Sequence, residues 1–479
     1  MKKEKNVPRI LFAAPASGSG KTVVTCGVLE LLKRRKISCV SYKCGPDYID
    51  PMFHRYVLGI PGYNLDSFFL DPDEVRRLLA EKAGRQKMAV MEGAMGYYDG
   101  VAGSTSHASA YEVARITDTP VVLIVDGKKS SLSLAAVIQG FLEYEKDSHI
   151  CGVIFNRTSS VMAERLGPLV ERLGVRVYGA IPACPEAELE SRHLGLTLPG
   201  EQKRLQENIK ALADRLESCL DVDGLVELAK SAALLPVGGS RQQGREEQSR
   251  LEEQPGPEEK PERKKQPEPE EQSKTKIIRR IAIARDEAFC FYYQENLEWL
   301  EREGWELIDF SPLHDSWLPC GLSAILLGGG YPELYARELS ENISMLEEIR
   351  KARRQGVKIL AECGGFLYLH QKLESMDGSV YPMTGLIEAE AYRTEKLSRF
   401  GYVVLYDRKG RRVAKGHEFH YWDSTCPGSC LKAVKPLSTR SWDCMHVEER
   451  MIAGFPHLYY KSNPDWILEF LEGGNNSGN

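Results

Sequence analysis

Short apolar runs alternate with longer amphipathic segments through the first 235 residues of the chain. The apolar runs predict strands at residues 9–14, 39–43, 88–92, 120–126, 151–156 and 177–181. Amphipathic segments between them, such as 21–35 and 163–173, predict helices. This alternation indicates a mostly parallel sheet that is covered by helices on both faces. Ligands of such sheets bind at the carboxyl ends of the strands.

The composition changes sharply between Gly238 and Lys276, where Pro, Glu, Gln, Lys and Arg dominate. Leu251 is the only large apolar residue there, so the segment cannot bury enough surface to offset its ordering entropy. Its five prolines also disfavour a long helix. We therefore predict a disordered linker. The predicted organisation is a first domain at 1–236, the linker at 237–277 and a second domain at 278–475.

A second alternating series follows the linker. It predicts strands at 280–285, 305–310, 323–327 and 357–362, with helices at 288–303 and 338–354. The predicted fold class is therefore α/β, with two doubly wound, mostly parallel-sheet domains. The chain length of 479 residues agrees with this, because single cores stop growing at about 250–300 residues.

Composition and charge narrow the class of protein. Hydrophobic residues at 42% and charged residues at 27% are ordinary for a globular protein, and the net charge of -5 argues against a nucleic-acid surface. No apolar stretch reaches the ~18 residues that a spanning helix needs, and the run at 10–15 is too short for a signal-peptide core. We expect a cytoplasmic protein with no membrane partner. The twelve cysteines form no CxxC pair, so we expect reduced thiols.

Residues 15–22, after the first predicted strand, have the character of a nucleotide phosphate loop. Small residues let backbone N–H groups face phosphates, and the following helix N-terminus adds a favourable potential. Lys21 would neutralise charge on ATP, and Thr22 would offer its hydroxyl to Mg²⁺. Pro15 breaks the strict spacing, so the motif is a variant, and a glycine-rich surface turn is the alternative. The loop residues expected to bind ATP are Gly18, Ser19 and Gly20.

A lysine and several acids lie near the ends of the next two predicted strands. Lys43 and Asp47 come with the second strand, and Glu92 ends the third. A lysine there can stabilise a transferring phosphoryl group, and carboxylates can hold Mg²⁺ directly or through water. Each residue could instead form a cap or a surface ion pair. That alternative carries more weight for Asp50 and Asp99.

Cys363 lies where the predicted strand 357–362 runs into a Gly-Gly turn and then a helix. We expect such a thiol to be exposed and close to a helix N-terminus, which favours the thiolate that attacks a carboxamide. Gly364 and Gly365 permit the sharp turn. The other cysteines lack this strand-turn-helix frame, and we expect them to be structural.

A thiol nucleophile needs a base and an oxyanion site. His457, after the last predicted strand, is the first choice of base, and His417 and His420 are alternatives. The pair could instead bind a metal, but zinc hydrolases place their histidines four apart. The turn 327–333 can offer N–H groups to an oxyanion, although a glycine-rich loop without function is the alternative. The expected oxyanion residues are Gly329, Gly330 and Gly364.

Together these stretches resemble the cobyrinate a,c-diamide synthase family of corrinoid biosynthesis. The shared motifs are SGSGKT, YKCGPDYIDPMFH, YNLDSFFL, MEGAMGYYDG, SRHLGL, LLGGGYPELYA, AECGGFLYL, GHEFHYW and HLYYKSNPDW. They occur in this order and cover nearly the whole chain except the linker. The resemblance implies a dethiobiotin-synthetase-like, P-loop NTPase-like domain joined to a class I glutamine amidotransferase-like domain.

The resemblance also implies a reaction. ATP would activate the a- and c-acetate carboxylates of cobyrinate as acyl phosphates, and ammonia would replace the phosphate. Glutamine would supply the ammonia through a cysteinyl thioester at Cys363, with His457 as base. Tyr459 stands where class I enzymes carry an acid, which is in keeping with a Cys-His dyad.

Further roles follow from the resemblance alone. Lys43 would face the phosphates, and Mg²⁺ would be held by Glu92 with Thr22 and Asp47. Cys44 and the long linker depart from the family pattern. The residues near the acceptor would be Asp47, Tyr48, Ile49, Arg192 and His193, and Asn156 would read the adenine base.

The principal hypothesis is thus an amide synthase that uses Mg²⁺, ATP, glutamine and a cobyrinate-type corrinoid. Relatives that act on hydrogenobyrinate or nickel sirohydrochlorin leave the acceptor open. A different class is a regulatory or scaffold protein that keeps the ATPase fold without amidation, and the intact candidate residues count against it. The sequence leaves a homodimer open.

Overall fold

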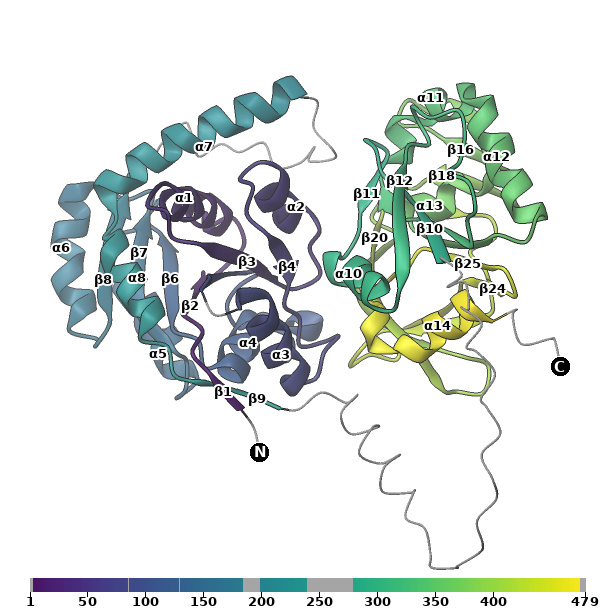
Figure 1. Ribbon diagram of the computed structural model, residues 1–479. Helices are drawn as coiled ribbons and strands as arrows, with labels where there is room; N and C mark the ends of the chain where they lie inside the picture. The colour runs from purple at the N-terminus through teal and green to yellow at the C-terminus, as the bar shows by residue number, and fades with distance from the viewer. Residues whose placement is uncertain (1–2, 85, 129, 184–198, 239–278, 474–479) are drawn as a thin grey trace, which may run out of the picture.

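The computed structural model describes residues 3–84, 86–128, 130–183, 199–238 and 279–473. The chain forms two α/β units that lie side by side (Figure 1). Most of the predicted linker lies outside the described residues, as do Arg192 and His193. In the part of the chain that is described, no helix is long and apolar enough to cross a membrane.

The N-terminal unit is built on a seven-stranded sheet in the order β4-β3-β5-β2-β6-β7-β8. Every neighbouring pair in it is parallel. The strands are β2 (Arg9–Ala13), β3 (Cys39–Cys44), β4 (Gly62–Asn64), β5 (Met88–Gly93), β6 (Val121–Asp126), β7 (Ile150–Asn156) and β8 (Arg176–Ile181). The six predicted strands are confirmed to within two residues. The sequence missed β4, because three residues are too few to show a pattern.

Helices cover both faces of this sheet. They are α1 (Lys21–Arg34), α2 (Ile49–Tyr56), α3 (Pro72–Ala83), α4 (Ala110–Thr117), α5 (Ser133–Tyr144), α6 (Ser160–Glu171), α7 (Pro199–Cys219) and α8 (Val222–Lys230). Strand β2 shows how the core is divided: Ile10 and Phe12 pack with α1, α7 and α8, whereas Leu11 and Ala13 pack with α3 to α6. Two short strands, β1 (Lys3–Lys5) and β9 (Leu235–Val237), pair with each other in antiparallel fashion.

The C-terminal unit has a central sheet in the order β12-β10-β13-β15-β25-β24, in which only the edge strand β24 is antiparallel. Its strands are β10 (Arg279–Ala284), β12 (Trp305–Phe310), β13 (Ala324–Leu327), β15 (Lys358–Glu362), β24 (His446–Glu448) and β25 (Met451–Gly454). The helices are α10 (Gln294–Arg302), α11 (Ala336–Glu341), α12 (Ile343–Arg354), α13 (Gly364–Tyr368) and α14 (Pro464–Glu472). The predicted α/β fold with two mostly parallel main sheets is confirmed.

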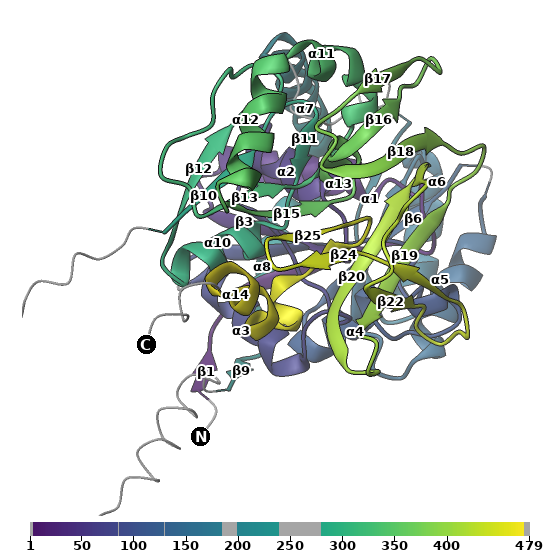
Figure 2. The ribbon, with the colours of Figure 1, turned by 90° about the vertical axis from the view of Figure 1, so that its right-hand side faces the viewer.

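Two further sheets, mostly antiparallel, extend the C-terminal unit. Figure 2 shows β19 and β20 as long neighbouring arrows. One sheet has the order β17-β16-β18-β21 and the other β23-β22-β19-β20-β26. The strands are β16 (His370–Glu374), β17 (Val380–Pro382), β18 (Ile387–Arg393), β19 (Arg399–Tyr406), β20 (Arg412–His420), β21 (Trp422–Ser424), β22 (Leu431–Val434), β23 (Ser441–Cys444) and β26 (His457–Leu458).

The predicted helix at 288–303 is wrong at its start. Residues Phe289–Phe291 form a strand, β11, which pairs with β14 (Gly329–Gly330), and the helix begins only at Gln294. The aromatic residues there favour an extended chain, and the glycine turn supplies a strand partner far away in sequence.

The two units contact each other through the segment 62–70. The Tyr402 hydroxyl donates a 2.8 Å hydrogen bond to Asp66 Oδ2, and the Tyr63 hydroxyl donates a 2.9 Å bond to Glu298. Phe69 stacks on Tyr459 with ring centroids 4.9 Å apart. The motif YNLDSFFL, to which the sequence assigned no role, therefore lies at the interface between the units.

Candidate active sites

The phosphate loop lies at the carboxyl end of β2, in the middle of its sheet. Gly18 and Gly20 have φ values of 77° and 92°, a region that favours glycine. A Cβ on Gly20 would also lie 2.1 Å from Asn156 Nδ2. Asn156 Nδ2 donates a 2.9 Å hydrogen bond to the carbonyl of Ser19, so this side chain braces the loop from β7. The sequence did not predict that contact.

Lys21 begins α1 and is buried against the same loop. Its Nζ donates a 3.3 Å hydrogen bond to the carbonyl of Ala16. Burial and the nearby Lys43 lower the pKa of Lys21 to about 8. An anion placed in the loop would counter both effects and favour the charged ammonium.

Five side chains lie together next to the loop, near the ends of β3 and β5 and the starts of α1 and α2. The Thr22 hydroxyl and Lys43 Nζ each donate a 2.7 Å hydrogen bond to Glu92 Oε1. Lys43 also forms an ion pair with Asp50, which is buried and so is no surface group. Asp47 Oδ2 lies 3.8 Å from Lys43 Nζ, while its Oδ1 accepts from the N–H of Ile49 at the start of α2.

The acids near this cluster differ in what they can offer a metal. Glu92 is fully buried, and its Oε2 has no hydrogen-bond partner, with the Thr22 hydroxyl bound to its other oxygen. A carboxylate oxygen and a hydroxyl fit Mg²⁺, which takes few protein ligands beside phosphates. Among the described residues no group of three or more His, Cys, Asp or Glu side chains could hold a metal. Asp99 Oδ2 accepts from the N–H of Gly96 in a turn.

Cys363 caps the N-terminus of α13 with φ 47° and ψ -103°. The expectation of an exposed thiol is wrong, because the residue is only 8% exposed. Burial, together with the carboxylates of Glu333 and Glu418, raises the pKa of the Cys363 thiol. The sequence showed the turn but could not show these acids, which arrive from other elements. A thiolate here depends on a base in contact with the thiol.

The topology places His457 beside that turn. Strands β15 and β25 are parallel neighbours, and the Cys363 N–H donates a 2.8 Å bond to the carbonyl of Gly454. His457 follows three residues later and is buried, with its Nδ1 3.9 Å from Glu362 Oε2. Burial, His417 and His420 lower the pKa of His457, so its imidazole is neutral.

The two alternative histidines have other partners. His417 stacks on His457 at 5.0 Å, and its Nδ1 lies 2.9 Å from the Tyr293 hydroxyl. His420 uses both ring nitrogens, one with the carbonyl of Trp422 at 2.6 Å and the other with Glu418 at 3.2 Å. One nitrogen of His417 and both nitrogens of His420 are therefore engaged within the protein.

The glycine turn packs directly on these groups. A Cβ on Gly329 would lie 2.3 Å from His457 Cε1. A Cβ on Gly364 would lie 2.9 Å from Pro332 Cδ and 3.0 Å from the backbone nitrogen of Gly330. Larger residues cannot be accommodated without movement of this packing, so Gly329 and Gly364 allow the turn to lie against the His457 ring and the start of α13.

Tyr48 joins the two units at this point. Its ring lies 5.2 Å from His457 and 5.5 Å from His417, and it stacks on Phe291 at 5.5 Å. The sequence grouped Tyr48 with Asp47 and half-buried Ile49 near the acceptor. In the fold, Asp47 of this segment lies near Lys43. The next residue, Tyr48, contacts the histidines of the other unit.

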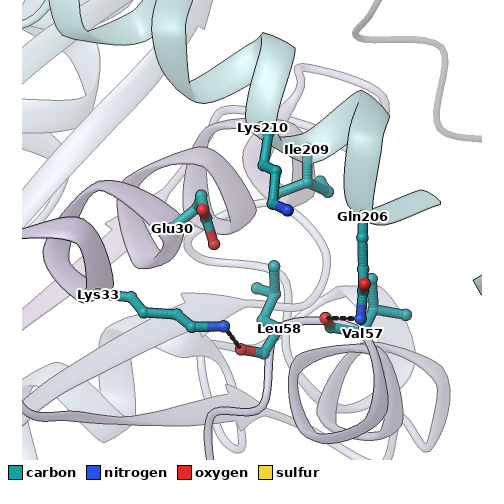
Figure 3. Close-up of a pocket in the computed structure, with 7 residues that line it drawn as sticks. All are labelled: Glu30, Lys33, Val57, Leu58, Gln206, Ile209 and Lys210. Carbon is teal, nitrogen blue, oxygen red and sulfur yellow. Dashed lines mark hydrogen bonds between the residues drawn. The ribbon is translucent and has the colours of Figure 1, made fainter. Parts of the chain in front are cut away.

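A separate pocket of about 100 Å³ lies beside α1 and α7, apart from all the candidate residues. In Figure 3, Lys33 donates to the carbonyl of Leu58 (2.6 Å) and Gln206 to that of Val57 (3.2 Å). The side chains of Lys33 and Gln206 are thus used within the protein. The lining residues are Glu30, Lys33, Val57, Leu58, Gln206, Ile209 and Lys210.

Comparisons with known proteins match both units. Residues 10–196 match the CobQ/CobB/MinD/ParA nucleotide binding domain, and residues 280–464 match the CobB/CobQ-like glutamine amidotransferase domain. Among solved structures, a glutamine amidotransferase covers 40% of this chain and 97% of its own, with a TM-score of 0.29 and 17% identity, which is too weak to add anything.

Three similar relatives are each named cobyrinate a,c-diamide synthase. The protein of Caldanaerobacter subterraneus subsp. tengcongensis is 36% identical, over 96% of this chain and 97% of the relative. That of Listeria innocua is 35% identical, over 97% of this chain and 99% of the relative. That of Salmonella typhimurium is 35% identical, over 96% of this chain and 97% of the relative.

Proposed function

Because the chain belongs to the cobyrinate a,c-diamide synthase family, we propose that it amidates the a- and c-acetate carboxylates of cobyrinate. ATP and glutamine are the other substrates, which makes the protein a carbon-nitrogen ligase. The contact of Tyr48 with His457 carries this proposal, because the segment beside the phosphate-binding cluster also reaches the glutamine site.

At the glutamine site, the Cys363 thiol gives its proton to His457 and attacks the carboxamide carbon of glutamine. The N–H groups of Gly329, Gly330 and Gly364 would hold the oxyanion that forms. His457 then returns the proton to the leaving nitrogen, so ammonia departs and a thioester remains. Water cleaves the thioester to glutamate and restores the thiol.

At the phosphate site, a carboxylate of the acceptor attacks the γ-phosphorus of ATP, which yields an acyl phosphate and ADP. Lys21 and Lys43 stabilise the negative charge of the transferring group, and the loop N–H groups of residues 18–20 bind the phosphates. Thr22 and Glu92 would hold Mg²⁺, with Asp47 a further candidate, and the ion would neutralise phosphate charge. Ammonia then displaces the phosphate to give the amide.

The proposal includes the remaining assignments. The synthase domain is 1–236, the linker 237–277 and the amidotransferase domain 278–475. Asp47, Tyr48 and Ile49 flank the acceptor carboxylate, and Asn156 holds the loop close to the adenine base. Arg192 and His193 would contact the macrocycle.

Mass spectrometry of the tetrapyrrole products tests the proposal. With cobyrinate, ATP, Mg²⁺ and glutamine we expect two carboxylates to become amides, each with a fixed mass change, and ADP and glutamate to appear. If product forms from hydrogenobyrinate or nickel sirohydrochlorin but not from cobyrinate, that other tetrapyrrole acid is the acceptor, and the assignment of cobyrinate is wrong. A folded protein that turns over none of these acids would overturn the proposal and favour a scaffold role.

A further inference from the structure

Tyr459 occupies the position two residues after His457, and its ring is stacked on Phe69 of the other unit. That side chain serves the interface and has no carboxylate. A carboxylate nevertheless reaches His457 from the neighbouring strand β15, because Glu362 Oε2 lies 3.9 Å from His457 Nδ1. Glu362 directly precedes Cys363 in the chain. Of the described carboxylates, Glu362 alone lies within 4.0 Å of this imidazole.

We propose that Glu362 is the positioning residue of the glutamine site, and that it accepts a hydrogen bond from His457 Nδ1–H. This inference rests on the proposed function. Donation from Nδ1 fixes the tautomer that leaves the lone pair on Nε2. That lone pair can then take the proton of the Cys363 thiol. The resulting triad has its acid on β15, one residue before the nucleophile.

The burial of both groups supports this role. The His457 side chain is 3% exposed and that of Glu362 is 7% exposed. His457 Nδ1 and Glu362 Oε1 are both buried without a hydrogen-bond partner in the described structure. Buried polar atoms without partners cost free energy, so a hydrogen bond from His457 Nδ1 to the Glu362 carboxylate, whose nearer oxygen is Oε2, would remove the cost at Nδ1. The distance of 3.9 Å is longer than a hydrogen bond, but catalytic hydrogen bonds in apo structures often tighten when substrate binds.

Two neighbours of Glu362 favour its ionised form. The N–H of Leu458 and the hydroxyl of Tyr460 act on the carboxylate and oppose the rise of its pKa. On the far face of His457, His417 is stacked at 5.0 Å with Nδ1 held by Tyr293, and His420 is bound to Glu418. Glu333 and Glu418 act on the Cys363 thiol, but neither reaches His457. Glu362 is therefore the acid placed to orient the base.

The proton movements balance with Glu362 ionised. The thiol proton moves to His457 Nε2, which creates an imidazolium between the thiolate and the Glu362 carboxylate. That proton later leaves with ammonia, and the imidazole becomes neutral again. Burial raises the pKa of Glu362 to about 8, so the ionised form grows as the pH rises through that value.

The test is the glutaminase activity of the full-length Glu362→Gln variant between pH 6 and about 9.5. The amide keeps the size of the side chain but carries no charge. We expect kcat to fall at least roughly 100-fold with little change in KM, since loss of the orienting acid of a Ser-His-Asp triad costs up to ~10⁴-fold. The rise in activity of the wild type near pH 8 should be missing. Glu362→Asp should restore part of the rate and keep a rise with pH.

Two readouts separate positioning from packing. Amidation driven by free ammonia should be unchanged in Glu362→Gln, because it does not need the glutamine site. Glu30→Gln, the same change at a buried glutamate on α1, should leave glutamine hydrolysis unchanged.

Glutamine hydrolysis by Glu362→Gln within twofold of wild type, with the same pH profile, would overturn the inference. So would a loss of rate in which the profile keeps its wild-type shape, since Glu362 would then only fill space. If Glu362→Gln does not fold, a Glu362→Asp variant with the rate and pH profile of the wild type would equally count against the inference. A wild type that hydrolyses no glutamine would instead remove the proposed function.

Discussion

Lys43 and Glu92 face each other across β3 and β5, with Nζ 2.7 Å from Oε1. Both side chains are buried, and Thr22 donates to the same carboxylate oxygen. The phosphate loop, the lysine and the candidate Mg²⁺ ligand are therefore one connected network. A change at any member should alter phosphoryl transfer and leave the residues of the glutamine site in place.

Glu92→Gln should abolish ATP-dependent amidation. The amide removes the charge that would attract Mg²⁺, while Lys43 keeps its ion pair with Asp50, so the fold should survive. We expect at least a 100-fold loss of ADP formation, on the order of the loss for one electrostatic group in an active site. Glutamine hydrolysis, measured as glutamate release, should persist. Glu388→Gln, at an exposed glutamate, is the control. An equal loss of ADP formation in this control would contradict a specific role of Glu92 in holding Mg²⁺.

Cys363→Ala should remove glutamine use and spare amidation with free ammonia. The thiol is the group that forms the thioester, whereas ammonia enters after that step. Product formation with each nitrogen source, measured by mass spectrometry, checks the prediction. Cys151→Ala, at an exposed thiol on β7, is the control and should behave as wild type. Loss of both activities in Cys363→Ala would mean that Cys363 does more than release ammonia.

Tyr48→Ala should uncouple the two reactions. The ring lies between the histidines of the glutamine site and the segment next to Lys43, so its removal opens that contact to water. We expect the ratio of glutamate released to amide formed to rise several-fold. Tyr144→Ala removes a ring that is 70% exposed and should leave the ratio near one. An unchanged ratio in Tyr48→Ala would exclude a sealing role for this ring.

Asp66 should make stability depend on pH. Burial raises the pKa of Asp66 to about 6, above its value of 3.8 in an unfolded chain. A raised pKa of an acid means that the folded state favours the protonated form. Stability is therefore full below about pH 4 and falls as the pH rises to about 6, by up to roughly 3 kcal/mol.

Asp66→Asn cannot ionise and should lack this fall. The difference in unfolding free energy between the variant and wild type should move in favour of the variant between pH 4 and 7. Denaturant unfolding at the two pH values measures it. Tyr402→Phe, which removes the hydroxyl partner but keeps the acid, should retain the pH dependence and lose about 1–3 kcal/mol of stability. A constant difference for Asp66→Asn would refute the assignment.

The sequence predicted what local patterns encode. The apolar runs of β2 and β5 and the Gly-Lys-Thr start of α1 depend on neighbours in the chain, and the structure has them as expected. The glycine turn at 327–333 and the sharp turn at Cys363 were predicted for the same reason. The sheets after residue 370 were missed, because strands such as β18 alternate apolar and exposed positions and only pair with segments far along the chain.

The details of the glutamine site depend on contacts that no local pattern encodes. The pKa of the Cys363 thiol is raised by burial and by acids on other elements, and Tyr48 reaches His457 from the other unit. Glu362 looked like the end of a buried strand, so only the alignment of β15 with β25 brings it to the imidazole. The sequence did contain one signal for this role, which is an acid at the end of an apolar strand, directly before the candidate nucleophile.

No strand crosses from one unit into the main sheet of the other among the described residues, and β1 pairs with β9 to close the N-terminal unit on itself. Each sheet is thus encoded by one continuous stretch of the gene. The chain could be divided between residues 239 and 278 and made as two polypeptides without the loss of a described strand. The segment 62–70, together with Tyr48, would then form part of the surface through which the halves reassemble.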